Sequence, residues 1–145
     1  MPVQDDAIDL LDEDHRNVER LFQQYKAAHD QSHKRTLAQQ ICQELTVHTR
    51  IEDEVFYPAF RQATGDQQMV QHSQKEHREA MDLVHRIEAA QVDDKLMLDL
   101  EDAILHHVND EREKMFPEAR KAKGLDLQQL AQQLQARKAE LMAHA

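Results

Sequence analysis

Apolar residues recur every three or four positions along most of the chain, which is the spacing of one face of an α-helix. In the first such stretch, residues 7–28, the apolar face consists of Ile8, Leu11, Val18, Phe22 and Tyr25. Similar stripes cover residues 34–63, 67–90 and 94–119, and a shorter one with leucines at heptad-like spacing follows Asp126. The pattern therefore predicts five helices.

Turn-forming residues separate these stretches. Gly65 breaks the chain after the second helix, and the pair Asp93-Asp94 is a typical N-cap before the fourth. Pro58 is expected either to kink the second helix or to end it one turn early. Because the connections are short, we predict an all-α fold, an up-down-up-down four-helix bundle with an additional C-terminal helix over residues 126–143.

The sequence contains no recognisable linker between these helices. It therefore predicts a single domain spanning residues 1–145, with the four-helix bundle over about residues 8–120. The fifth helix is expected to pack across the bundle or against another subunit, and the second arrangement would give a homo-oligomer.

One segment of the sequence occurs twice. Residues 48–58 read His-Thr-Arg-Ile-Glu-Asp-Glu-Val-Phe-Tyr-Pro, and residues 107–117 read His-Val-Asn-Asp-Glu-Arg-Glu-Lys-Met-Phe-Pro. Each copy follows an acid-His-Arg tripeptide, at residues 14–16 and 76–78. Each half of the bundle is therefore predicted to carry one lone histidine and one His-x-x-x-Glu pair, whose two side chains share a helix face.

The histidines and glutamates of this repeat lie within the predicted apolar stripes: they are His15, His48, Glu52, His77, His107 and Glu111. A buried carboxylate without a partner is costly or becomes neutral, so six such groups on the core faces of four helices need a common partner. Two transition-metal ions with a bridging oxo or hydroxo group would supply it. Mixed imidazole and carboxylate ligands match iron best, and zinc, copper and manganese less well.

Each part of this pattern has a simpler interpretation when it stands alone. A single histidine on a core face is more often a hydrogen-bonded core residue than a ligand, and an isolated His-x-x-x-Glu is usually a surface ion pair. His15 with Glu19 and His72 with Glu76 have that spacing and are interpreted mainly in this way. The recurrence of the whole pattern, including its aromatic residue and proline, favours a metal site.

The fourth helix contains two pairs with the same spacing, His106 with Asp110 and His107 with Glu111. Because the proline of each repeat lies ten residues after its histidine, the register selects His107 and Glu111 and places His106 on a flank of the helix. The neighbouring charged residues of the repeat are assigned to a solvated face: Asp53, Glu54, Arg112 and Glu113.

Composition argues against several other functions. The net charge of −10 disfavours nucleic acid or an anionic membrane as a partner, and no apolar run approaches the roughly 20 residues of a membrane span. Cys42 is the single cysteine, which fits a reducing compartment, and the N-terminus has no signal-peptide pattern. No glycine-rich phosphate loop is present, so no organic cofactor is expected. We expect a soluble, cytoplasmic protein.

With these residues in place, the chain resembles the hemerythrin-like family, also called histidine–histidine–glutamate cation-binding domains. The resemblance covers about residues 8–120 and rests on the order His, His-x-x-x-Glu, His, His-x-x-x-Glu. It implies a four-helix bundle with a non-haem di-iron centre bridged by two carboxylates. The ligands that it implies are His15, His48, Glu52, His77, His107 and Glu111.

The chain departs from the oxygen-carrying hemerythrins at two places. Those proteins have a fifth histidine four residues before the one that matches His77, where this chain has Ser73, and a longer His-to-Asp spacing where it has His107-x-x-x-Glu111. The departures argue against reversible oxygen carriage. Further donors considered beside the six are His72, His85, Tyr25 and Glu19.

Six protein ligands leave about one position per iron open, and an open position is where a small molecule can bind or react. The predicted function is binding or turnover of O2, NO or H2O2, with a catalase-like peroxide reaction as its enzymatic form. The alternatives are a non-enzymatic iron or oxygen sensor, an iron-binding module, and a helical adaptor without metal. The sequence assigns no catalytic residue.

Overall fold

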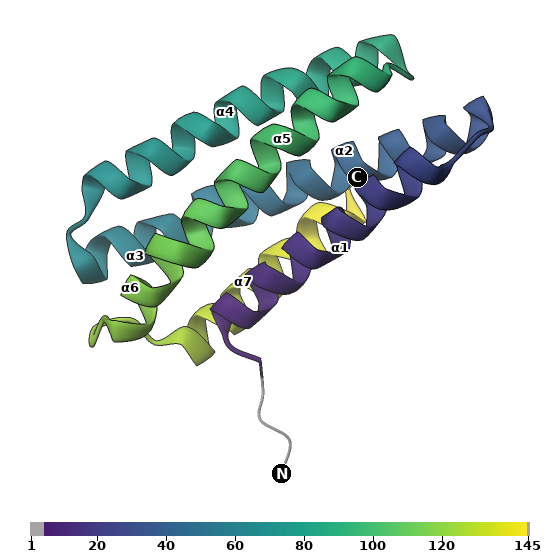
Figure 1. Ribbon diagram of the computed structural model, residues 1–145. Coiled ribbons are helices and arrows are strands. Elements are labelled where there is room, and N and C mark those ends of the chain that lie inside the picture. Colours follow the sequence, from purple (N-terminus) through teal and green to yellow (C-terminus); the bar gives the residue numbers. More distant parts are fainter. Residues whose placement is uncertain (1–4, 145) are drawn as a thin grey trace.

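The computed structural model describes residues 5–144, and within that range it contains helices and no strand (Figure 1). Five helical runs are present: α1 (Ala7–Ala27); α2 (Gln31–Ile51), η1 (Glu52–Phe56) and α3 (Tyr57–Thr64); α4 (Gln67–Ala90); α5 (Asp94–Asp110), η2 (Glu111–Met115) and α6 (Phe116–Lys121); and α7 (Leu127–Ala143). The first four runs form the bundle and α7 is the additional helix, so the predicted fold class is confirmed. None of the described helices is long and apolar enough to span a bilayer.

Each of the five runs begins after an aspartate whose side chain accepts a hydrogen bond from a backbone N–H of the first turn. These N-caps are Asp6, Asp30, Asp66, Asp93 and Asp126. They satisfy N–H groups that a helix otherwise leaves unpaired, and their charge suits the positive end of the helix dipole. Gly65 ends the second run at a φ of 73°, a left-handed conformation that glycine adopts without steric cost.

The second and fourth runs each contain one π-helical turn, which starts at a glutamate of the sequence repeat. The N–H of Tyr57 donates to the carbonyl of Glu52, five residues earlier, and the N–H of Phe116 donates to Glu111 in the same way. A proline follows each turn. Pro58 has no N–H, and its ring would collide with the carbonyl four residues back in a regular α-helix. The wider turn removes the collision, so the expectation of early termination at Pro58 is wrong.

The helix α7 packs on its own bundle, across α1, α2 and η1. Its buried residues are Leu130, Ala131 and Leu134, and the two leucines join an apolar cluster that also contains Leu11 and Ile51.

A second apolar cluster fills the other half of the bundle and includes Val18, Leu45 and Ile104. Along the buried face of α1, Leu11 belongs to the first cluster, Val18 belongs to the second, and His15 lies between them. Buried polar residues therefore separate the two clusters. The packing therefore holds a polar layer in the middle of an apolar core.

Leu134→Ala is expected to lower the free energy of unfolding by about 2–5 kcal/mol, because it removes a fully buried leucine between α7 and the bundle. Leu134 is 1% exposed, whereas Leu98, on α5, is 50% exposed. Leu98→Ala is therefore the control, with an expected change below about 0.5 kcal/mol. Urea unfolding of the metal-free protein, followed by circular dichroism, measures both variants. Similar midpoints for the two would contradict the docking of α7.

Candidate metal centre

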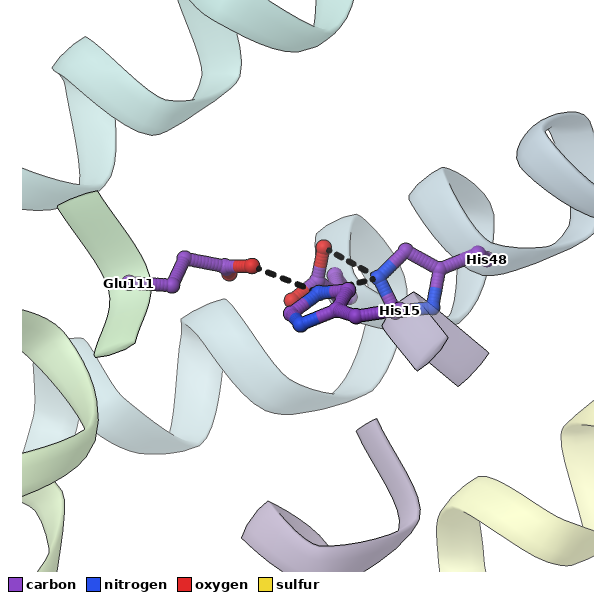
Figure 2. Close-up of side chains that lie close together, drawn as sticks. His15, His48 and Glu111 are labelled. Atoms are coloured by element: carbon purple, nitrogen blue, oxygen red, sulfur yellow. Dashed lines mark hydrogen bonds and ion pairs between the residues drawn. The ribbon is translucent and has the colours of Figure 1, made fainter. Parts of the chain in front are cut away.

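The six residues singled out by the repeat lie in one cluster in the polar layer of the bundle. They come from all four runs: His15 from α1, His48 from α2, Glu52 from η1, His77 from α4, His107 from α5 and Glu111 from η2. All six are buried, and both glutamates are 0% exposed. Figure 2 shows the side chains of His15, His48 and Glu111 directed toward one another.

The four imidazoles form two pairs. His15 Nε2 lies 3.1 Å from His48 Nε2, and His77 Nε2 lies 3.0 Å from His107 Nε2. The first pair joins α1 to α2 and the second joins α4 to α5, so each helical hairpin contributes one pair.

The two carboxylates lie between these pairs. Glu52 Oε1 is 3.1 Å from His48 Nε2 and 3.1 Å from His77 Nε2. Glu111 Oε1 is 3.0 Å from His15 Nε2 and 3.5 Å from His107 Nε2. Glu52 Oε1 also lies 3.8 Å from His107 Nε2. Each carboxylate therefore contacts imidazoles of both pairs, and neighbouring cations held by the two pairs could share it.

An acidic side chain contacts the outer nitrogen of every imidazole. The four contacts are His15 Nδ1 to Asp12 at 3.2 Å, His48 Nδ1 to Asp14 at 3.0 Å, His77 Nδ1 to Asp53 at 3.0 Å, and His107 Nδ1 to Glu76 at 2.8 Å. A carboxylate can only accept a hydrogen bond, so in a neutral imidazole the Nδ1 carries the proton and the Nε2 lone pair faces the cluster. That is the tautomer that a metal ion needs, and the acid increases the basicity of the ligand.

The hydrogen bonding inside the cluster is incomplete without a cation. Glu52 Oε2 is buried and has no hydrogen-bond partner among the described residues. A buried carboxylate oxygen without a partner costs free energy, and coordination to a metal ion would remove that cost. The donor set of imidazole nitrogens and carboxylate oxygens therefore fits transition-metal cations.

In the metal-free protein, protons supply part of the missing positive charge. Burial lowers the pKa of His48, but the charges and hydrogen bonds of Glu52 and Asp14 together outweigh this effect and raise the pKa to about 10. Burial also lowers the pKa of His107, but Glu111, Glu52 and Glu76 together raise it to about 11. Burial would raise the pKa of Glu52, yet the charge of His48 and the hydrogen bonds around the carboxylate together hold it well below its usual value. A metal ion must displace protons from these imidazoles.

The sequence repeat accounts for part of the outer layer of acids. Asp14 and Glu76 occupy the same position in the acid-His-Arg tripeptides, and each contacts an imidazole of the neighbouring helix. Asp53 and Arg112 also occupy matched positions of the repeat, but their contacts differ. Asp53 contacts an imidazole directly, whereas Arg112 donates to Asp12 Oδ1 at 2.6 Å. The assignment of Asp53 and Arg112 to a solvated face is therefore incomplete: both are partly exposed, yet each supports a histidine.

Tyr57 is a further member of the cluster that the sequence analysis did not identify. Its hydroxyl donates to Glu111 Oε2 at 2.9 Å and lies 3.1 Å from His77 Nε2 and 3.3 Å from His107 Nε2. Burial and the charges of the two glutamates raise the pKa of Tyr57, so the metal-free protein holds the protonated phenol. A regular helix advances about 100° per residue and would place Tyr57, nine residues after His48, on the opposite face. The π turn η1, in which the N–H of Tyr57 bonds to the carbonyl of Glu52, turns the side chain back toward the cluster.

The other donors considered from the sequence lie outside the cluster. Tyr25 bonds to Asp94 and Glu19 accepts from Arg112, while His72 and His85 are exposed on α4. Ser73 is buried one turn before His77, and His106 is exposed beside Glu76. None of these side chains joins the four histidines and two glutamates.

The sequence profile of the hemerythrin HHE cation binding domain matches residues 6–119. The chain belongs to this family. Among solved structures, a hemerythrin HHE cation binding domain-containing protein from Mycobacterium kansasii has a TM-score of 0.82 at 20% identity, over 97% of this chain and 90% of that one. At this identity the match shows the shared fold. No curated protein sequence gives a significant match. The HHE family and the buried donors together indicate a metal cation site.

Asp53→Asn is expected to weaken zinc binding at the HHE centre by about 10–100-fold, because a neutral amide supports the His77 imidazole less well than a carboxylate does. Asp82→Asn, at an exposed position of α4, is the matched control and should bind zinc like the wild type. Competition with a chromophoric chelator measures both affinities. Wild-type affinity in Asp53→Asn would show that this contact does not support the centre.

At pH 8 the metal-free protein should hold His48 and His107 as imidazolium ions, because their pKa values of about 10 and about 11 lie above that pH. Addition of zinc should convert both to neutral imidazoles. Nitrogen-15 chemical shifts of the imidazoles, recorded by NMR before and after zinc is added, distinguish the two forms. Neutral signals in the metal-free sample would contradict the electrostatic balance described above.

Proposed function

We propose that this HHE protein holds two iron ions and that the loaded centre binds or reacts with a small oxidant, with peroxide decomposition as the enzymatic form. The observation that carries the proposal is the orientation of the donors. Four imidazoles direct Nε2 into one buried cluster, each with an acid on Nδ1, and two carboxylates lie between the pairs.

Two ions would divide the donors between them. His15 and His48 would hold one ion and His77 and His107 the other, with Glu52 and Glu111 shared between them. When bound, two irons would supply Lewis acidity and two-electron redox chemistry, as required for the conversion of two H2O2 into O2 and two H2O. Iron suits this mixed nitrogen and oxygen set better than zinc, which undergoes no redox change.

The surroundings of the centre favour small uncharged molecules. A cavity of about 10 Å³ lies against all four histidines, which is room for about one water-sized molecule. Its remaining walls are largely apolar and include Val18, Leu45, Ala80, Ile104 and Val108. A charged or large substrate would lose its hydration there without compensation, which favours molecules as small and uncharged as O2, NO and H2O2.

Tyr57 supplies a proton donor beside two of the four histidines. Its hydroxyl lies within hydrogen-bond distance of Glu111 and of the Nε2 atoms of His77 and His107. The phenol is therefore positioned to hold a proton next to a small molecule at the centre, or to act as a seventh protein ligand, through its oxygen, toward a cation.

The alternative function is a non-enzymatic sensor, and one contact favours it. Lys138, on α7, donates to Asp14 Oδ1 at 2.6 Å, and the other oxygen of Asp14 contacts His48 Nδ1. A change in metal occupancy at His48 would thus alter the charged contact between Asp14 and the additional helix.

Oxygen release from hydrogen peroxide by the iron-loaded protein, measured with an oxygen electrode, tests the enzymatic proposal. His48→Ala and Glu111→Ala should each reduce the rate by at least about 100-fold, because each removes a donor from the centre. Glu113→Ala is the control on the same turn, since Glu113 is exposed and outside the cluster. Unchanged release in the two donor variants would refute the proposal. Two bound irons without oxygen release would favour the sensor.

A further inference from the structure

A second group of metal-binding side chains lies on the outer surface of α4 and α5. His72 and Glu76 are one turn apart on α4, and His106 and Asp110 are one turn apart on α5. The two helices pack side by side as a hairpin (Figure 1). Two His-x-x-x-acid pairs therefore face each other across the hairpin, and we call these four residues the outer cluster.

The carboxylates of the outer cluster lie between its imidazoles. Glu76 Oε2 is 3.5 Å from His72 Nε2 and 3.3 Å from His106 Nε2. Asp110 Oδ2 is 3.4 Å from His72 Nε2 and 3.5 Å from His106 Nε2. Each acid thus faces two imidazoles, whereas a surface ion pair needs only one partner for each acid.

The acids and the imidazoles differ in exposure. The side chains of Glu76 and Asp110 are 10% and 21% exposed, and those of His72 and His106 are 59% and 70% exposed. Packing therefore fixes the carboxylates, and the exposed imidazoles have room to adjust around an ion that arrives from solvent.

We propose that the outer cluster is a second site that binds one divalent transition-metal ion. His72, Glu76 and Asp110 offer donor atoms within 4.8 Å of one another, and the exposed His106 imidazole supplies a fourth donor by turning toward His72. This set of imidazole nitrogens and carboxylate oxygens suits Zn²⁺ and also Fe²⁺. Two carboxylates with neutral imidazoles balance the charge of a divalent ion. Lys114 Nζ approaches Asp110 Oδ1 only to 3.8 Å, and it leaves Asp110 Oδ2 to the imidazoles.

Glu76 connects the outer cluster to the HHE centre. Its Oε1 accepts from His107 Nδ1 at 2.8 Å, and its Oε2 faces His72 and His106. A cation on Oε2 would draw negative charge away from Oε1 and weaken the hydrogen bond to His107, which lowers the basicity of His107 Nε2. An ion at the surface is therefore expected to weaken metal binding at the centre, and the coupling is reciprocal.

Zinc is the probe for this site because it has no redox chemistry and leaves NMR signals sharp. Equilibrium dialysis of the full-length protein should show one more zinc ion per chain in the wild type than in the double variant His72→Gln/His106→Gln. The imidazole signals of His72 and His106 should shift during uptake of that weaker ion. His85→Gln removes another exposed histidine of α4 and should retain the wild-type stoichiometry.

Equal zinc stoichiometry in the wild type and the double variant would overturn the outer site. The variant His15→Ala/His48→Ala, which lacks two donors of the HHE centre, should still bind zinc at the outer cluster, and a complete loss of zinc binding there would also overturn it. Neither result depends on peroxide chemistry, so failure of the proposed function leaves this test intact.

The coupling through Glu76 has its own readout. Zinc added to the iron-loaded protein should shift the near-ultraviolet absorption of the centre in the wild type and not in His72→Gln/His106→Gln. An unchanged wild-type spectrum at saturating zinc would overturn the coupling.

Discussion

The burial of two charged carboxylates beside four imidazoles is the constraint on which the rest of this structure depends. Glu52 and Glu111 lie in the middle of the bundle, between two apolar clusters that keep water away. Charges in such a place are tolerated only when opposite charges touch them. In the bundle, the Nε2 atoms of the four imidazoles face the two carboxylates, and an acidic side chain contacts each Nδ1. The acidic groups outnumber the imidazoles, so the centre favours the binding of cations. In the metal-free protein, protons on the imidazoles supply positive charge. A metal ion would supply it more effectively because one ion contacts several donors at once.

The two halves of the centre are related by the sequence repeat but are not chemically equal. Tyr57 and Phe116 occupy the same repeat position, after the π turns η1 and η2. The Tyr57 hydroxyl reaches His77 and His107, whereas the Phe116 ring stacks on His15 with centroids 5.9 Å apart. One histidine pair therefore has a proton donor beside it and the other has an apolar ring. The two sides of the centre therefore offer a cation different surroundings.

Most of the fold and the clustering of the six central residues were predictable because both depend on regular spacing. The 3.6-residue period gave the helices, and the repeat distinguished His107 and Glu111 from His106 and Asp110. Tyr57 was missed because the π turn breaks the regular advance of 100° per residue, and no spacing rule anticipated it. Asp53 was missed because its contact with an imidazole on α4 is a tertiary one. The outer cluster was missed for a similar reason: each of its pairs alone is a common surface motif, and only the pairing of α4 with α5 brings them together.

The helix α7 covers apolar residues and also takes part in the charge network of the centre. The family profile ends at residue 119, yet Lys138 of α7 donates to Asp14 at 2.6 Å. Burial alone would raise the pKa of Asp14, and the contacts with His48 and Lys138 together hold it below its usual value. A charged Asp14 is what keeps the proton of a neutral His48 on Nδ1 and its Nε2 free for a metal. The additional helix therefore belongs to the same electrostatic unit as the HHE centre, and the leucines that dock it keep the lysine in place.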